Sequence, residues 1–158
     1  MLADGRGGSI INVASILGII GQADLSPAYH ASKSAVINLT RNLASSWGDR
    51  GIRVNALAPG WFPSEMTAPL FSLPGFMDWA NGLSPLGRVG RPEELIGPLL
   101  FLASDASSFV TGETLVVDGG ITSGGAGGKM PASFYQTMSS ALPPELAGKI
   151  MPSDKMNA

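Results

Sequence analysis

Three side chains near the start of the chain are of types that together could move a proton to or from an oxygen atom. Tyr29 and Lys33 stand four positions apart, so on a helix they share one face. A phenol is a poor base in neutral water, and a nearby ammonium group favours its phenolate form. Ser15 adds a hydroxyl that could hold a substrate oxygen while its charge changes. The trio predicts acid–base chemistry at a substrate oxygen.

The elements that must position this trio form a strand, a helix and a second strand. Residues 9–14 are short, apolar and β-branched, which predicts a strand covered on both faces with Ser15 at its carboxyl end. Residues 28–47 lack Gly and Pro, and Ser26-Pro27 and Gly48 are start and stop signals for a long helix. Residues 52–57 predict a second strand. This βαβ unit implies parallel strands and a doubly wound α/β fold, in which ligands bind at the carboxyl ends.

The second half of the chain continues this alternation. Residues 61–87 carry five of the 11 aromatic residues together with several prolines, and they predict a long apolar excursion that covers something. A helix is expected from Pro92 to about Ala103, a capped turn over 105–111, and a third strand over 113–118. We assign residues 5–122 to the domain and residues 123–158 to a Gly-rich linker and a partly disordered tail.

Composition excludes several other classes of function. Ten basic and 12 acidic side chains give a net charge of −2, so nucleic acid is not an expected partner. The absence of Cys and the single His30 argue against disulfides and against a metal site. No apolar run approaches membrane length, so we expect a soluble, cytoplasmic protein. With 44% hydrophobic and 14% charged residues, the chain is expected to bury faces against other subunits, as a homo-oligomer.

A Tyr–Lys pair at this spacing also occurs on ordinary amphipathic helices, where the lysine stem covers apolar surface. An ordered set of further motifs decides between the two interpretations. They are Asn12-Val-Ala-Ser15-x-x-Gly18, Tyr29-His-Ala-Ser-Lys33, Asn55-Ala-x-x-Pro59-Gly60, Pro85-Leu-Gly-Arg-Val-Gly-Arg-Pro-Glu-Glu-Leu95, Phe101-Leu-Ala-Ser-Asp105 and Thr111-Gly112-Glu-x-Leu-Val-Val-Asp118-Gly119-Gly120. Over roughly residues 5–122 this set resembles the short-chain dehydrogenase/reductase family.

The resemblance implies the carboxyl-terminal half of a Rossmann-like sheet and an NAD- or NADP-dependent interconversion of a secondary alcohol and a carbonyl. In the oxidative direction, Tyr29 would take the hydroxyl proton and Ser15 would orient the oxygen. Lys33 would bond the nicotinamide ribose and favour the Tyr29 phenolate. Hydride would pass from the carbinol carbon to the nicotinamide. The expected partners are therefore a small alcohol or carbonyl compound and, in the full-length form, one or three further copies of the protein.

The resemblance also implies cofactor contacts after the second strand. Pro59 and Gly60 would shape the turn against the nicotinamide, Phe62 would offer backbone contacts to the carboxamide, and Ser64 would take the place of the family's usual hydroxyl residue. Asn55 is expected to be structural. The segment 61–87 matches the family's variable substrate lid, and simple packing over the cofactor is the alternative. His30 points about 100° away from Tyr29 around the helix, so a surface or interface position is expected.

One departure from the family pattern is large, because the chain begins just before the family's fifth strand. The Gly-x-x-x-Gly-x-Gly phosphate loop, the residue that selects NAD or NADP, and the helix Asn of the catalytic tetrad have no counterpart in the sequence. We therefore expect a truncated chain whose function belongs to a longer parent. The alternative is a non-catalytic remnant that binds sibling subunits through the helix 28–47 and the strand 113–118.

Overall fold

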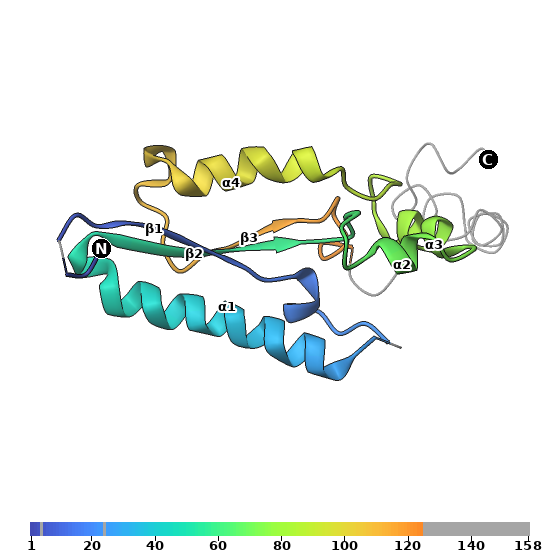
Figure 1. Ribbon diagram of the computed structural model, residues 1–158, viewed down its shortest axis with the longest axis horizontal. Helices are drawn as coiled ribbons and strands as arrows, with labels where there is room; N and C mark the ends of the chain where they lie inside the picture. Colours follow the sequence, from blue (N-terminus) through green and yellow to red (C-terminus); the bar gives the residue numbers. More distant parts are fainter. Residues whose placement is uncertain (4, 24, 125–158) are drawn as a thin grey trace, which may run out of the picture. The chain divides into compact units, whose positions relative to one another are not determined.

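A three-stranded parallel β-sheet with the order β1-β2-β3 is the frame of the molecule (Figure 1). Its strands are β1 (Gly8–Val13), β2 (Ile52–Pro59) and β3 (Thr114–Val117). The register pairs Gly8 with Ile52 and Val13 with Leu57, and it pairs Ala56 with Thr114. The predicted α/β fold with three parallel strands is confirmed, and all three carboxyl ends lie at one edge of the sheet.

The computed structural model describes residues 1–3, 5–23 and 25–124, and these belong to one unit, Met1–Gly124. The predicted linker and tail lie outside the described residues from residue 125 onward. Within the described part of the chain, no helix is both long and apolar enough to cross a membrane.

The two main helices lie on opposite faces of the sheet, α1 (Pro27–Trp47) below it and α4 (Ile96–Ala103) above it in Figure 1. Ser26 caps α1, and Pro27 stands in the first turn, where its missing N–H costs nothing. α4 is shorter than predicted, because Pro92–Leu95 forms the 3₁₀ helix η3. Pro98 explains this difference, since it has no N–H to donate to the carbonyl four residues earlier.

Short helices form the connections. They are η1 (Ile16–Gly18), η2 (Gly48–Arg50), α2 (Ala68–Phe71), α3 (Phe76–Leu83) and η4 (Asp105–Ser107). α2 and α3 lie within the apolar excursion predicted for residues 61–87, and η4 lies within the predicted capped turn.

The core follows the central strand. Ile52 and Val54 of β2 pack with Ala44 of α1, and Ala56 and Ala58 of the same strand belong to a second buried cluster. β1, by contrast, is only half-buried, and Val13 is 58% exposed. The expectation of a strand covered on both faces is met in part, because α1 and α4 contact β1 from opposite faces but leave it half-buried. β1 pairs on one side only within the described sheet, so its side chains at the edge remain accessible.

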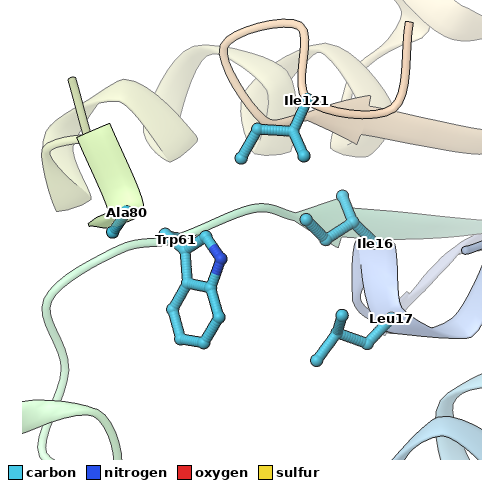
Figure 2. Close-up of a cluster of buried hydrophobic side chains, with 5 residues drawn as sticks. All are labelled: Ile16, Leu17, Trp61, Ala80 and Ile121. Carbon is cyan, nitrogen blue, oxygen red and sulfur yellow. The ribbon is translucent and has the colours of Figure 1, made fainter. Parts of the chain in front are cut away.

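A third cluster lies beyond the carboxyl ends of the strands and is shown in Figure 2. It joins five buried side chains from different parts of the chain: Ile16, Leu17, Trp61, Ala80 and Ile121. The Trp61 ring stacks edge-on against Phe76 and Trp79, with centroids 5.3 and 5.5 Å away. This cluster closes the end of the sheet at which the predicted catalytic residues stand.

Candidate active site

Ser15 follows β1 at its carboxyl end. Ala14 still donates to the Leu57 carbonyl at 2.8 Å, and the chain then turns into η1. The Ser15 hydroxyl caps this turn by accepting from the Leu17 N–H at 3.2 Å, and its side chain is buried. Within the described part of the chain this hydroxyl accepts a hydrogen bond but donates none. Its proton is therefore available to a ligand oxygen.

Tyr29 and Lys33 lie one turn apart on α1, as the spacing predicted. The Lys33 Nζ atom is 5.6 Å from the centroid of the Tyr29 ring. It also donates to the Val13 carbonyl at 3.0 Å, which ties the amine to the end of β1 two residues before Ser15. This bond uses one of the three N–H groups of the ammonium. The positive charge is thus fixed beside the phenol.

Gly18 allows η1 to approach α1 closely. A Cβ atom at this position would lie 2.6 Å from the carbonyl carbon of Lys33 and 2.9 Å from the backbone nitrogen of Ser34. The Ser34 hydroxyl in turn donates to the Gly18 carbonyl at 2.9 Å. The Ser15 turn and the backbone of Lys33 are therefore locked together by main-chain contact, which gives a physical reason for a glycine three residues after Ser15.

Ser15 and Tyr29 line the same cavity, whose volume is about 230 Å³. The other lining residues come from η1, the chain just before α1, and the segment after β2 up to α2: Ile16, Leu17, Leu25, Ser26, Gly60, Trp61, Met66, Thr67 and Leu70. Lys33 does not line it, and its Nζ atom lies over the Tyr29 ring. A hydroxyl donor and a phenol at one cavity, with a cation beside the phenol, can polarise a carbonyl or deprotonate an alcohol.

The two residues predicted to shape the turn after β2 are placed differently. Pro59 ends the strand opposite Val117 and is not among the lining residues, whereas Gly60 lines the cavity. A Cβ atom on Gly60 would lie 2.8 Å from the Cα and Cβ atoms of Asp118. The glycine thus lets the end of β2 pass close to the chain that leaves β3.

Phe62 and Ser64, the other predicted cofactor contacts, lie beside the cavity and do not line it. The Phe62 ring fills the space where a side chain at Gly90 would stand, and its carbonyl accepts from the Thr67 hydroxyl at 2.8 Å. The Ser64 hydroxyl is 3.0 Å from that of Thr67, and the Ser64 N–H donates to the same hydroxyl at 2.8 Å. Thr67 therefore organises this turn.

Sequence reasoning missed several wall residues, in particular Leu25, Ser26 and Thr67. The Ser26-Pro27 pair was recognised only as a helix start, although the same serine faces the cavity. Thr67 sits in a segment without helical or strand periodicity. A hydroxyl three residues after Ser64 is a turn signal that could have found it.

His30 was expected at the surface or an interface, and that expectation was incomplete. The ring is half-buried, and both of its nitrogens are hydrogen-bonded, one to the Ser26 carbonyl and one to the Gln22 N–H. The helical angle that separates His30 from Tyr29 did not account for the chain that precedes α1.

Asn55 and Asp118 have structural roles. Asn55 is fully buried, donates to the Val110 carbonyl at 2.9 Å and accepts from the Glu113 N–H at 3.1 Å, which agrees with the structural role expected for it. The Asp118 carboxylate accepts from the N–H groups of Gly120 and Thr122 at 2.8 and 2.7 Å. Both side chains shape the loops around β3.

The segment before α4 is held by a charged cluster. Glu94 accepts two hydrogen bonds from the Arg88 guanidinium, at 2.8 and 2.7 Å, and one from the Arg91 N–H at 2.8 Å. The Arg88 bonds, followed by that from the Arg91 backbone, lower the pKa of Glu94 from 4.5 to about 2. This cluster fixes the turn whose Val89 packs against the Trp61 cluster.

An α/β sheet with a serine after β1 and a Tyr-x-x-x-Lys helix that meet at one edge defines a class of nucleotide-dependent oxidoreductase folds. Residues 1–122 match a family model described as enoyl-(acyl carrier protein) reductase. The chain belongs to the short-chain dehydrogenase/reductase family. It is 47% identical over 122 residues to gluconate 5-dehydrogenase of Gluconobacter oxydans, covering 77% of this chain and 47% of that protein.

Other relatives are also dehydrogenases, and they match over a similar share of their length. Galactitol 2-dehydrogenase (L-tagatose-forming) of Cereibacter sphaeroides is 46% identical over 123 residues, which are 77% of this chain and 48% of that protein. Among solved structures, a gluconate 5-dehydrogenase of Burkholderia cenocepacia in complex with NADP and tartrate aligns with a TM-score of 0.73 at 43% identity, covering 77% of this chain and 47% of that chain. The chain thus spans about half the length of the relatives it matches.

Proposed function

We propose that this chain carries the catalytic centre of an NAD- or NADP-dependent oxidoreductase that interconverts a secondary alcohol and a carbonyl compound. One observation carries the proposal: the Ser15 hydroxyl and Tyr29 line one cavity while the Lys33 ammonium lies beside the Tyr29 ring. Ser15, Tyr29 and Lys33 are the proposed catalytic residues. The membership in the family supports the reaction type.

In the oxidative direction the substrate hydroxyl binds between Ser15 and Tyr29. The Ser15 hydroxyl donates a hydrogen bond that orients the substrate oxygen, and the Tyr29 phenolate accepts its proton. Lys33 stabilises that phenolate by charge. When bound beside the cavity, a nicotinamide would supply the hydride chemistry at the carbinol carbon. In the reductive direction, Tyr29 returns the proton to the oxygen of the forming alcohol.

The residues present fit the nicotinamide end of such a cofactor. Lys33 keeps two N–H groups beyond its bond to the Val13 carbonyl, and these suit the hydroxyls of a ribose. Gly60 brings bare backbone to the cavity. We assign Tyr29, Lys33, Pro59, Gly60, Phe62 and Ser64 to this end of the cofactor. Solved neighbours crystallised with NADP or NADH support the choice of group.

The cavity wall favours an uncharged substrate with hydrocarbon surface. None of the described residues that line it carries a charge, and most are aliphatic or aromatic. A carboxylate next to this wall would lose hydration without gaining a cationic partner. A cyclic secondary alcohol should therefore be turned over more efficiently than a hexonate.

The test measures turnover by the full-length protein through the absorbance of the reduced nicotinamide. Tyr29→Phe should lower kcat by about 10²–10⁴-fold because it removes the acid–base group. The dissociation constant of the nucleotide should stay nearly unchanged. Ser32→Ala is the control, since among the described residues the Ser32 hydroxyl bonds only the Tyr29 carbonyl of its own helix. Full activity in Tyr29→Phe would contradict the assignment.

A second candidate is a non-catalytic role in subunit association. It is favoured by the outer face of α4, where Ile96, Leu99 and Leu100 are exposed. We expect this face, and α1, to contact further copies of the protein in a homo-oligomer. The two candidates separate on nucleotide binding by the full-length protein, since only the first requires it.

A further inference from the structure

The chain just before α1 contributes one wall of the cavity through Leu25 and Ser26. Leu25 also packs against the Trp61 cluster. Ser26 is the cap of α1, and its hydroxyl accepts from the Tyr29 N–H at 3.4 Å. The Ser26 carbonyl also accepts from the N–H groups of Tyr29 and His30 at 3.1 and 3.3 Å, which ties this residue to the first turn of α1. Leu25 and the chain before it belong to no regular element, and one side-chain contact lies directly beside them.

That contact is the imidazole of His30. Its Nδ1 atom is 2.9 Å from the Ser26 carbonyl, and its Nε2 atom is 3.2 Å from the Gln22 backbone nitrogen. A carbonyl only accepts and a backbone N–H only donates, so Nδ1 must carry the hydrogen and Nε2 must be bare. The ring therefore acts as donor on one side and acceptor on the other. It ties Gln22, three residues before Leu25, to Ser26 and the first turn of α1.

We propose that His30 is a positioning residue that selects the substrate by fixing the Leu25–Ser26 wall of the cavity. This inference rests on the function proposed above and deepens it. His30 does not line the cavity, so it acts through the wall and not on the reacting atoms. Ser15 and Lys33 are held separately, by the contact of Gly18 with Lys33 and by the bond from Lys33 to the Val13 carbonyl. Tyr29 is held within the first turn of α1, where its own N–H donates to the Ser26 carbonyl at 3.1 Å.

This separation predicts a divided kinetic effect. When the bond to Gln22 is lost, the Leu25–Ser26 wall becomes less well fixed and the substrate binds less tightly. The chemical step is unchanged, because Ser15, Tyr29 and Lys33 keep their places. The KM of the substrate should therefore rise while kcat stays the same.

The test uses two substitutions that each keep one half of the imidazole's hydrogen bonding. In His30→Gln the side-chain oxygen reaches as far as Nε2 and can accept from the Gln22 N–H. In His30→Asn the shorter amide can replace only the Nδ1–H donor to the Ser26 carbonyl. With cyclohexanone as the probe in the full-length protein, His30→Asn should raise KM about 5-fold and change kcat less than about 2-fold. His30→Gln should keep KM near the wild-type value, and Ser32→Ala should change neither constant.

A second measurement does not depend on turnover. Hydrogen exchange at the Gln22 amide, followed by NMR, should be faster in His30→Asn than in wild type and close to wild type in His30→Gln. Unchanged KM and unchanged exchange in both variants would overturn the inference, and so would a loss of kcat at constant KM. If the wild-type protein turned over no alcohol or ketone, the proposed function would fail. The role of His30 in fixing the wall would then be decided by the Gln22 exchange alone.

Discussion

Two sides of one cavity are built in different ways. On the catalytic side, the Ser15 turn and the Lys33 backbone meet by main-chain contact through Gly18, and Lys33 is bonded to a β1 carbonyl. On the opposite side, Trp61 is held by the rings of Phe76 and Trp79. Backbone contacts tolerate almost no added atoms, whereas a cluster of rings can repack around a new side chain. The proposed catalytic residues are therefore rigidly placed, whereas the proposed substrate wall can vary.

The largest expected effect is that of a methyl group on the catalytic side. Gly18→Ala places a Cβ atom against the Lys33 carbonyl, so η1 must move away from α1 and carry Ser15 with it. We expect kcat to fall at least about 10²-fold and the free energy of unfolding to fall by about 1–3 kcal/mol. Gly21→Ala is the matched control, because a Cβ atom there meets nothing within 4 Å. If the two variants behaved equally in urea unfolding and in turnover, the rigid packing inferred for the Gly18 side of the cavity would be contradicted.

A smaller effect is expected on the opposite side. Phe76→Leu removes a ring that stacks on Trp61, Phe71 and Trp79, at the cost of about 1–2 kcal/mol of unfolding free energy. KM should change while kcat stays within about 2-fold, since the Ser15 turn does not rest on this ring. The control is Phe109→Leu, in a fully exposed side chain. A kcat loss in Phe76→Leu as large as that of Gly18→Ala would show that the two sides are not independent.

The smallest effect on stability is expected from the charged cluster of Arg88, Arg91 and Glu94, which supports the Trp61 side of the cavity. The pKa of Glu94 is about 2 in the folded protein, below the ordinary 4.5, so ionised Glu94 stabilises the fold. This stabilisation is complete above about pH 4.5 and is lost as the pH falls toward 2. Glu94→Gln should therefore lower Tm slightly at pH 7, and the difference should shrink below pH 4.5. Glu93→Gln serves as the neighbouring control. A Tm difference between Glu94→Gln and wild type that grew on acidification would contradict the predicted direction of this pH dependence.

The frame, and the placing of Tyr29 and Lys33 one turn apart on a helix, could be predicted from the sequence because both leave local patterns. β-branched runs of strand length gave the three strands, and a Gly- and Pro-free run gave α1, which places Tyr29 and Lys33 on one face. The walls of the cavity could not be found in this way. Leu25 and Thr67 lie in irregular segments and meet only in three dimensions. His30 was placed by its angle on its own helix, which carries no information on the chain that folds back against it.

The central claim is that Tyr29, beside Lys33 and opposite Ser15, moves the proton while hydride passes between a nicotinamide and a carbinol carbon. The most direct measurement supplies the full-length protein with reduced nicotinamide nucleotide dideuterated at C4 and with cyclohexanone, and locates the label in the product by NMR. We predict one deuterium on the carbinol carbon with the wild-type protein and almost no product with Tyr29→Phe. Unlabelled product from wild type, or labelled product formed by Tyr29→Phe at the wild-type rate, would contradict the claim.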